Sequence, residues 1–484
     1  MMLKRFYEER LAQASFLLGC RASGEAVVID PNRDVEKYVI RAQSEGLRIS
    51  VVTETHIHAD FVSGSRALAR RTGAELAVSG EGGRDWQYAF AGEPGVRLLH
   101  EGDTIRAGSV CLTARHTPGH TPEHLAFLLT DEATSPVEVG VFAGDFIFAG
   151  DVGRPDLLER AVGVSGTMEA GARQLFRSLK RFRQLPDRLL LWPGHGAGSA
   201  CGRQLGDMPV TTLGYEKVAN WAFHLNDEAQ FVEKVLKDQP EPPRYFAEMK
   251  RLNRIGAEEA ATGPAHFSPD LLVSAIRTRA TEIQVLDLRP AADFAGGFVP
   301  GTVSIPLGNS FLNWAGALLD PGQEIYLIGE EAQVREAAAA LALIGLDRVT
   351  GWFQPQALDY WRGQQGELAQ MEQLGAVEML DRQRHGHLVL DVRSVAEFRS
   401  AHVPGALHIP LGRIPEEVLG LPRDAAIIVH CQGGGRSPVA LSLLRRLGFP
   451  RLANFSGGFA EYQGQGLPVE SGSAPDFAQV PPRR

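Results

Sequence analysis

The sequence predicts a multidomain α/β protein, and three observations lead to that fold class. Short apolar runs alternate with helix-forming stretches along the chain, which is typical of sheets covered by helices. The 484 residues exceed the size at which a single hydrophobic core keeps growing, so we expect several domains. The second half of the chain also repeats itself, which indicates two copies of one small domain.

The repeat is seen in a motif that begins at Asp287 and returns at Asp391, with a constant offset of 104 residues. The matching segments are Asp287-Leu288-Arg289, Phe294, Val299-Pro300-Gly301 and Ile305-Pro306-Leu307 against Asp391-Val392-Arg393, Phe398, Val403-Pro404-Gly405 and Ile409-Pro410-Leu411. In each copy one apolar run precedes the Asp-x-Arg motif, and another precedes a helical stretch rich in Ala and Leu. Strands that alternate with helices predict a parallel sheet.

The first half forms one larger unit, in which several apolar runs end in a turn that carries His, Asp or Gly. These runs are residues 26–29, 49–52, 75–78, 139–142 and 189–191. Functional side chains at strand ends are typical of layered α/β enzymes. We predict domains at residues 1–256, 271–368 and 369–472, a linker at 257–270 and a C-terminal tail at 473–484.

Composition limits the classes of partner. The net charge of −9 and the lack of a clustered block of Lys or Arg argue against nucleic-acid and anionic-membrane binding. No run reaches the roughly 20 apolar residues of a membrane helix, and the N-terminus lacks the pattern of a secretory signal. We therefore expect a cytoplasmic protein that binds small molecules, and we expect it to form a homo-oligomer.

A cluster of metal-ligand residues follows the run at 49–52. In Thr55-His56-Ile57-His58-Ala59-Asp60-Phe61 an extended backbone would point His56, His58 and Asp60 to one side, because side chains alternate along a strand. The alternative for this segment alone is a hydrogen-bonded surface loop. Further ligand residues lie in three later motifs: His116-Thr117-Pro118-Gly119-His120-Thr121-Pro122-Glu123-His124, Gly144-Asp145 and Pro193-Gly194-His195-Gly196.

The order of these motifs, THxHAD, PGHT, GD, GR and PGH, resembles the metallo-β-lactamase fold, which is an αββα sandwich. The phrases HADFVSG, HTPGHTPEH and FAGDFIFAGDVGRPDL are most similar to the persulfide dioxygenases of that fold. This resemblance implies one Fe²⁺ per chain, held by His56, His120 and Asp145. Two imidazoles and one carboxylate on one face of a ferrous ion leave positions for a substrate thiolate and dioxygen.

Dinuclear hydrolases of the same fold place a histidine directly after the Asp of the first motif, where this chain has Phe61. His58, Asp60 and His195 remain as residues that orient ligands and water, or that bind a second metal. The alternative to the iron site is therefore a Zn²⁺ site that hydrolyses thioesters, of the glyoxalase II type.

Arg154 and Cys201 are two further candidates for the substrate pocket. Arg154 follows the carboxylate strand, and its guanidinium suits a carboxylate or phosphate of a thiol carrier. Its alternative is a bond to Asp156 or to a loop carbonyl. Cys201 follows the His195 motif by six residues, and its alternative is a small buried apolar residue. The four cysteines form no CxxC pair, so neither a disulfide framework nor a cysteine zinc site is predicted.

Cys431 lies between an apolar strand and an apolar helix, in Val429-His430-Cys431-Gln432-Gly433-Gly434-Gly435-Arg436-Ser437. Backbone N–H groups, the helix dipole and Arg436 would favour its thiolate, which predicts a nucleophile. The loop residues that would hold a persulfide or thiosulfate group are Gln432, Gly433, Gly434, Gly435 and Ser437. Cysteine phosphatases share this arrangement, but they separate Cys and Arg by five residues, whereas four separate them here.

The shorter loop resembles rhodanese, as do DVRSVAEFRSAHVPGALHIP before it and NFSGGFAEY after it. In the first copy the corresponding strand ends Leu327-Ile328-Gly329-Glu330-Glu331, so this rhodanese-like copy lacks the cysteine. We expect it to act as a spacer or packing platform. The Asp-x-Arg motifs that begin at Asp287 and Asp391 are interpreted as structural ion pairs at strand ends.

The whole chain resembles the bacterial three-domain fusions of a persulfide dioxygenase with a rhodanese. That resemblance implies oxidation of a low-molecular-weight thiol persulfide by dioxygen to sulfite, with Cys431 making or using thiosulfate. The fusion would raise the effective concentration of one product near the other site. The remaining alternatives are a zinc thioesterase with a rhodanese domain and a non-catalytic sulfur-binding scaffold.

Overall fold

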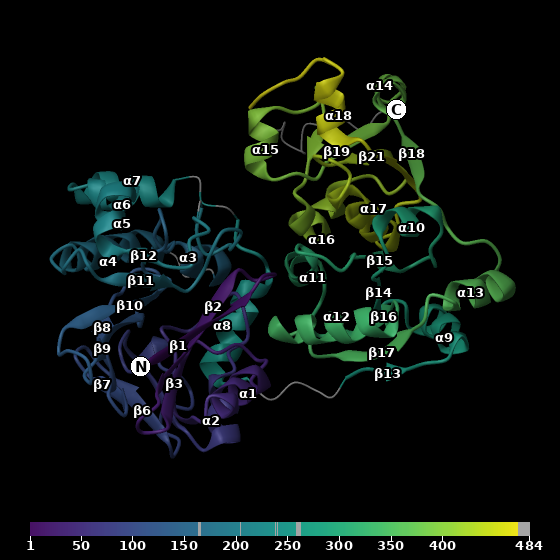
Figure 1. Ribbon diagram of the computed structural model, residues 1–484. Coiled ribbons are helices and arrows are strands. Elements are labelled where there is room, and N and C mark those ends of the chain that lie inside the picture. The colour runs from purple at the N-terminus through teal and green to yellow at the C-terminus, as the bar shows by residue number, and fades with distance from the viewer. Residues whose placement is uncertain (163–165, 204, 238, 240, 258–262, 473–484) are drawn as a thin grey trace. The chain divides into compact units, whose positions relative to one another are not determined.

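The computed structural model describes residues 1–484 apart from 163–165, 204, 238, 240, 258–262 and 473–484 (Figure 1). The chain divides into two compact units, which are residues 1–260 with 342–345 and residues 261–341 with 346–484. The predicted C-terminal tail lies outside the described residues. Within the described ranges, no helix combines the length and the apolar character that crossing a membrane requires.

Two six-stranded sheets form the first unit. The first sheet contains β1 (Met2–Glu8), β2 (Gln13–Cys20), β3 (Glu25–Ile29), β4 (Arg48–Thr53), β5 (Glu75–Ser79) and β6 (Val96–Leu99), in that order. The second contains β7 (Thr104–Ala107), β8 (Val110–His116), β9 (Leu125–Asp131), β10 (Glu138–Gly144), β11 (Leu190–Pro193) and β12 (Thr211–Thr212). From β3 to β6 neighbouring strands are parallel, so their carboxyl ends lie at one edge of the sheet.

Helices cover the outer face of each sheet. The helices of this unit are α1 (Glu36–Ser44), α2 (Ser65–Thr72), α3 (Leu157–Val162), α4 (Thr167–Phe182), α5 (Leu213–Ala219), α6 (Trp221–His224), α7 (Glu228–Leu236) and α8 (Tyr245–Ile255), with a 3₁₀ turn η1 at Arg84–Trp86. α1 and α2 pack on the first sheet, and α4 and α7 pack on the second. Between the sheets lies an apolar core that includes Phe16, Phe127 and Phe142. The predicted αββα sandwich is confirmed.

The sequence pattern explains these layers. Every residue of β2 is buried, because this strand faces the sandwich core on one side and helices on the other. α4 buries one stripe whose members recur every three or four residues: Ala172, Leu175, Phe176, Leu179 and Phe182. That stripe packs against strands β9, β10 and β11 of the second sheet. It therefore fixes β10, whose end carries a residue of the candidate site.

Two five-stranded parallel sheets form the second unit, one for each copy of the repeat. The first has the order β13-β17-β16-β14-β15, with β13 (Ala265–His266), β14 (Ile283–Asp287), β15 (Val303–Ser304), β16 (Glu324–Ile328) and β17 (Val349–Phe353). The second has the order β18-β22-β21-β19-β20, with β18 (Glu372–Leu374), β19 (Leu388–Asp391), β20 (Leu407–His408), β21 (Ala426–His430) and β22 (Arg451–Phe455). The identical strand order confirms the predicted pair of rhodanese-like α/β folds.

The helices of the second unit connect these strands. In the first copy they are α9 (Pro269–Arg279), α10 (Ala291–Gly296), α11 (Phe311–Leu318), α12 (Glu331–Leu343) and α13 (Ala357–Gln365). In the second they are α14 (Ala376–Arg384), α15 (Val395–Ser400), α16 (Ile414–Glu417), α17 (Arg436–Arg446) and α18 (Gly458–Gly464), with 3₁₀ turns η2 (Leu411–Arg413) and η3 (Val418–Gly420).

Part of the segment predicted as a linker, residues 257–270, belongs to the first copy's fold. Residues 258–262 lie outside the described residues, but β13 and the first residues of α9 fall within the segment. β13 pairs with β17, and the ring of His266 lies 4.4 Å from that of Trp352. A short polar segment can form a strand here because the edge of an existing sheet supplies its hydrogen-bond partners.

α17 joins the second copy to the first through backbone groups. The Arg446 guanidinium donates to three carbonyl oxygens, those of Gly301 at 3.1 Å, Ala280 at 3.0 Å and Ile283 at 2.6 Å. One turn earlier on the helix, Ser442 Oγ accepts a hydrogen bond from Ser304 N at 3.0 Å. The two copies are therefore fixed to each other by one face of the helix that follows Cys431.

Replacement of Arg446 by Met should destabilise the second unit by about 2 kcal/mol, since three carbonyls lose a charged donor. Hydrogen exchange across a urea series, read by mass spectrometry, reports the unfolding of residues 280–305. The control is Arg335→Met on α12, because that side chain is 78% exposed and should change stability by less than about 0.5 kcal/mol. Equal effects of the two variants would show that the Arg446 contacts do not hold the copies together.

Candidate metal centre and cysteine loop

The first candidate metal site gathers three buried side chains from separate strand ends. His56 comes soon after β4, His120 comes after β8, and Asp145 directly follows β10. Their ligand atoms lie within 4.8 Å of one another. Asp145 Oδ2 is 3.5 Å from His120 Nε2 and 3.9 Å from His56 Nε2. The structure thus brings together the three residues that the resemblance implied as iron ligands.

The polar atoms of this cluster fit a bound cation. His56 Nε2 and both carboxylate oxygens of Asp145 are buried and make no hydrogen bond within the described part of the chain. The other ring nitrogens are engaged, since His56 Nδ1 lies 2.9 Å from Thr55 Oγ1 and His120 Nδ1 donates to the carbonyl of Arg154 at 2.9 Å. Such bonds orient a ligand imidazole and leave its second nitrogen for the metal.

Burial gives the imidazoles the charge state that metal ligation needs. It lowers the pKa of His120 to about 3, and it lowers the pKa of His56 well below the ordinary value with help from the neighbouring His58. Both rings are therefore neutral near pH 7. Burial also raises the pKa of the Asp145 carboxyl to about 6, and a bound cation would favour its ionised form.

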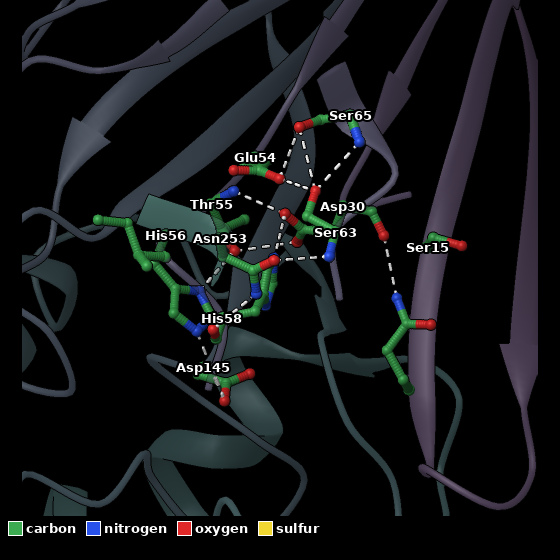
Figure 2. A network of polar contacts seen from close by, with 12 residues as sticks. Ser15, Asp30, Glu54, Thr55, His56, His58, Ser63, Ser65, Asp145 and Asn253 are labelled. Carbon is green, nitrogen blue, oxygen red and sulfur yellow. Dashed lines mark hydrogen bonds and ion pairs between the residues drawn. The ribbon is translucent and has the colours of Figure 1, made fainter. Parts of the chain in front are cut away.

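His58 does not join this cluster. Its ring centre is 4.2 Å from that of His56, but its Nε2 lies 3.1 Å from Asp30 Oδ1 (Figure 2). Burial alone would lower the pKa of His58, but the Asp30 carboxylate outweighs it and raises that pKa to about 9. The expectation that His56, His58 and Asp60 converge on one point is wrong, because the backbone leaves the extended conformation after β4 and Asp30 holds His58.

Asp60 instead belongs to a second cluster beside the first, with His195 and Cys201. His195 Nε2 lies 3.3 Å from Asp60 Oδ2 and 3.4 Å from Asp145 Oδ1, so Asp145 faces both clusters. Cys201 is buried, and burial together with the two carboxylates raises the pKa of its thiol well above the ordinary value. Cys201 therefore faces the site as the sequence suggested, and it does so as a neutral thiol.

Two residues with left-handed backbone support these histidines. Among the described residues other than glycine, Ala12 and Asp30 are the ones with a positive φ, 49° and 50° respectively. The Ala12 carbonyl accepts a hydrogen bond from His195 Nδ1 at 3.1 Å, and the Asp30 carboxylate contacts His58. Strained backbone of this kind is concentrated at functional sites, where the surrounding structure maintains it.

Asn253 on α8 holds the loop that carries His58, and Figure 2 shows its amide beside that histidine. Asn253 Nδ2 donates to the carbonyl oxygens of His58 at 2.8 Å and Phe61 at 2.7 Å, and Asn253 Oδ1 accepts from Ser63 N at 2.8 Å. Neither Asn253 nor Asp30 was predicted from the sequence. Asp30 had a signal, since it directly follows the buried run at 26–29, but nothing near Asn253 in the sequence points to the site.

Arg154 does not lie at a pocket mouth, which corrects the prediction that it binds substrate. Its side chain is fully buried, and its guanidinium donates two hydrogen bonds to Asp156, both at 2.8 Å, and one to the carbonyl of Ala200 at 3.1 Å. The alternative interpretation, in which Arg154 binds Asp156 and a loop carbonyl, is therefore the correct one. The backbone carbonyl of Arg154 orients His120.

A cavity of about 620 Å³ adjoins the first cluster. Its walls include Ile57, which lies between the two histidines of the HxH motif, and Gly119, which precedes His120. One helix, α8, contributes a basic wall of Lys250, Arg251 and Arg254. Burial lowers the pKa of Lys250 to about 7, and Arg251 is paired with Glu248. Trp86 also lines the cavity, and Lys250 Nζ lies 3.7 Å from the centre of its ring. This combination suits an organic ligand with negative charges.

Cys431 lies at the end of β21, and α17 begins five residues later at Arg436. Gly434 N donates a hydrogen bond to Cys431 Sγ at 3.2 Å, and Ser437 Oγ lies 3.7 Å from the same sulfur. Gly434 has a φ of 86°, a conformation that disfavours other residues. The loop therefore places one backbone N–H donor and one serine hydroxyl on the sulfur.

The guanidinium of Arg436 is engaged by a carboxylate. It donates to both oxygens of Glu397, at 2.8 and 2.7 Å, and Glu397 also completes a capping box with Ser394 at the start of α15. Although burial opposes it, Arg436 lowers the pKa of Glu397 to about 2. Arg393, which pairs with Asp391, donates to Gln432 Oε1 at 3.0 Å and so orients the first residue after the cysteine.

The register of the sheets identifies the residue that replaces the cysteine in the first copy. Asp287 pairs with Ile328 in the first copy, as Asp391 pairs with His430 in the second. Gly329 is therefore the counterpart of Cys431. α12 begins two residues after Gly329, so the first copy lacks the sulfur-binding loop as well as the thiol.

Comparison with known proteins places both parts of this architecture. The model of the metallo-beta-lactamase superfamily matches residues 9–195, and that of the rhodanese-like domain matches residues 375–465. The crystal structure of a metallo-beta-lactamase from Staphylococcus aureus subsp. aureus COL is 43% identical, with a TM-score of 0.66, and the match covers 99% of that chain and 74% of this one. The chain belongs to the metallo-beta-lactamase superfamily. Its C-terminal part carries a rhodanese-like domain.

Two relatives of the metallo-β-lactamase domain have different activities. The hydroxyacylglutathione hydrolase of Rhodospirillum rubrum is 30% identical over 37% of this chain and 60% of its own length. The mitochondrial persulfide dioxygenase ETHE1 of Bos taurus is 29% identical over 40% of this chain and 68% of its own length. Identity alone does not separate a hydrolase from a dioxygenase here, so the arrangement of the site has to decide.

Replacement of Asp145 by Ala should reduce bound metal from about one ion per chain to below about one tenth, because the first cluster loses its carboxylate. His58→Gln should retain the ion, since His58 lies outside the cluster. Elemental analysis after anaerobic loading with Fe²⁺ measures both, with His100→Gln, which is 58% exposed, as the control. Full metal content in Asp145→Ala would show that the first cluster is not the binding site.

Proposed function

We propose that the chain oxidises low-molecular-weight thiol persulfides at the first cluster and transfers sulfane sulfur at Cys431. In the first reaction a thiol persulfide, dioxygen and water give the free thiol, sulfite and two protons. The outer sulfur is oxidised and dioxygen is reduced, so no further oxidant is needed. In the second reaction the persulfide formed on Cys431 gives its outer sulfur to sulfite, which yields thiosulfate and the Cys431 thiolate.

The observation that carries the first part is the ligand set of His56, His120 and Asp145. Two neutral imidazoles and one carboxylate that converge from separate strand ends suit a single Fe²⁺. Bound there, a ferrous ion would supply open coordination positions for the persulfide thiolate and for dioxygen. Phe61 supports one metal rather than two, since its buried ring lies against His58 at 4.4 Å where dinuclear hydrolases have a further ligand.

The cavity beside the cluster supports an organic, anionic thiol carrier as the substrate. Persulfides of thiols such as glutathione or coenzyme A carry carboxylate or phosphate groups, and α8 presents Lys250, Arg251 and Arg254 to them. Ile57 and Gly119 line the same cavity and directly follow or precede the ligand histidines His56 and His120 in the chain. In this proposal the basic wall binds the carrier and the buried cluster receives the persulfide.

The second part of the proposal follows from the loop at Cys431. The Gly434 N–H that contacts the sulfur can also stabilise the negative charge of a persulfide on it. Arg436 lines the same pocket, where its guanidinium is paired with Glu397. Cys431 acts as the nucleophile, and its loop holds the sulfur between the two half-reactions.

Oxygen consumption tests the proposal directly. With Fe²⁺ loaded, the wild type should consume about one dioxygen per glutathione persulfide and release sulfite. Cys431→Ser should keep this activity and lose thiosulfate formation, because the iron site does not use Cys431. His56→Ala should lose oxygen consumption and keep sulfur transfer from thiosulfate to cyanide. If oxygen consumption were absent from iron-loaded wild type, the dioxygenase assignment would be wrong.

The basic wall makes a separate prediction about substrate affinity. Arg254→Ala should raise the KM for glutathione persulfide about fivefold and change kcat less than about twofold, because Arg254 would bind the carrier and not the reacting sulfur. Steady-state oxygen consumption at several ionic strengths measures both constants. Arg70→Ala on α2, a side chain that is 61% exposed, is the control. An unchanged KM would show that the carrier binds elsewhere.

One observation favours a second candidate, a zinc-dependent thioester hydrolase of the glyoxalase II type. His195 Nε2 lies within 3.4 Å of both Asp60 and Asp145, and Asp60, His195 and Cys201 form a second cluster that a second ion could use. Two zinc ions per purified chain, together with hydrolysis of S-lactoylglutathione, would support this candidate. One iron per chain and no thioester hydrolysis would support the dioxygenase.

A further inference from the structure

The pocket above Cys431 has walls from both copies of the repeat. It encloses about 410 Å³ and is lined by Ser310, Trp314, Cys431, Gly433, Gly435 and Arg436. Ser310 directly precedes α11, and Trp314 lies on that helix one turn later. α11 belongs to the first copy, which has no cysteine. The copy without chemistry of its own therefore contributes to the site of the other copy.

The residues of the cysteine loop leave little side-chain surface for recognising a substrate. Gly433 and Gly435 have no side chains, and Cys431 is the reacting group. The guanidinium of Arg436 is held by Glu397 through two hydrogen bonds. Among the lining residues, the side chains that remain to contact the body of a substrate are Ser310 and Trp314, and both come from the first copy.

Trp314 is held in place by its helix. On α11 the neighbouring residues Phe311, Leu312 and Ala315 are buried, whereas Trp314 is half-buried. The helix also packs against the second copy at η2, where the Cβ of Ala317 is in van der Waals range of Gly412. Since residues four apart lie on one face of a helix, Ser310 and Trp314 face the pocket together.

The position of this wall relative to Cys431 is fixed by α17. The helix begins at the end of the cysteine loop, and its residues Ser442 and Arg446 bind backbone groups of the first copy. One of these groups is Ser304 N on β15, six residues before Ser310. The loop and the tryptophan are thus joined by a short, hydrogen-bonded path.

We propose that Trp314, with Ser310, determines which sulfur donors Cys431 accepts, and that the indole contacts the organic part of a thiol persulfide. The proposal rests on the sulfurtransferase function proposed above. In the transfer, the Cys431 thiolate attacks the outer sulfur of the donor, the sulfur–sulfur bond of the donor breaks, and the carrier leaves as a thiolate with that electron pair. The pocket, of about 410 Å³, has room for the organic part of a persulfide beside the indole.

Sulfur loading of the full-length chain under anaerobic conditions tests this assignment without oxygen-dependent turnover. Glutathione persulfide and thiosulfate serve as donors, and mass spectrometry measures how fast one sulfur is added, with Cys431→Ser as the background. Trp314→Ala should slow loading from glutathione persulfide about tenfold and loading from thiosulfate by less than about twofold. Trp314→Phe should restore most of the rate. Tyr360→Ala, an exposed aromatic residue on α13 of the same copy, is the matched control.

Two results would overturn the assignment in distinguishable ways. Suppose that the wild type loads sulfur from both donors. If Trp314→Ala then loads from each donor as fast as the wild type, or slows to the same degree with both, Trp314 does not select the donor. If wild type gains no sulfur from either donor, the sulfurtransferase function itself fails and the assignment fails with it. A selective loss with glutathione persulfide, reversed by Phe, would support it.

Discussion

The buried carboxylate of Asp30 orients the two histidines of the HxH motif, His58 directly and His56 through Thr55. It accepts hydrogen bonds from Thr55 N at 2.6 Å and Thr55 Oγ1 at 2.9 Å, and it holds His58 Nε2 at 3.1 Å. Thr55 Oγ1 also lies against His56 Nδ1, so the orientation of His56 depends on Asp30 through one intermediate. These bonds offset the left-handed backbone of Asp30, which a non-glycine residue adopts only at a cost of about 1–3 kcal/mol. Through these bonds the strained residue Asp30 leaves His56 available to the metal and holds His58 away from it.

Asp145 is the point at which the two candidate activities diverge. Its Oδ2 faces His56 and His120, and its Oδ1 faces His195 and through it Asp60. The same carboxylate can therefore complete a site for one ion or bridge two. A second metal ion would have fewer imidazole ligands here. Phe61 stands where a histidine would be, and His58 is held by Asp30. The proposed preference for a single iron thus rests on the residues that surround the ligands as much as on the ligands.

Sequence alone was sufficient for features that depend on local patterns and insufficient for those that depend on contacts between distant segments. His56, Asp145 and Cys431 follow apolar runs, and strands bury such runs so that the next residues emerge at one edge, whereas His120 was found through its motif. Arg154 failed as a prediction because a bonded partner, the Ala200 carbonyl, lies far along the chain and makes burial of the guanidinium favourable. Asn253 and Trp314 lie on helices whose sequences carry no ligand motif, and only the packing of those helices brings them to the two sites.

The two copies of the repeat show which residues serve the fold and which serve the chemistry. Asp287 with Arg289 and Asp391 with Arg393 form the same bidentate pair, and each arginine also binds a carbonyl at the equivalent position, Gly297 or Ala401. That pair is structural, since it persists where the cysteine has become Gly329. The contact from Arg393 to Gln432 belongs to the second copy, where it orients the cysteine loop. The first copy has the same fold without a cysteine loop, and because it packs on α17 it holds α11 beside Cys431.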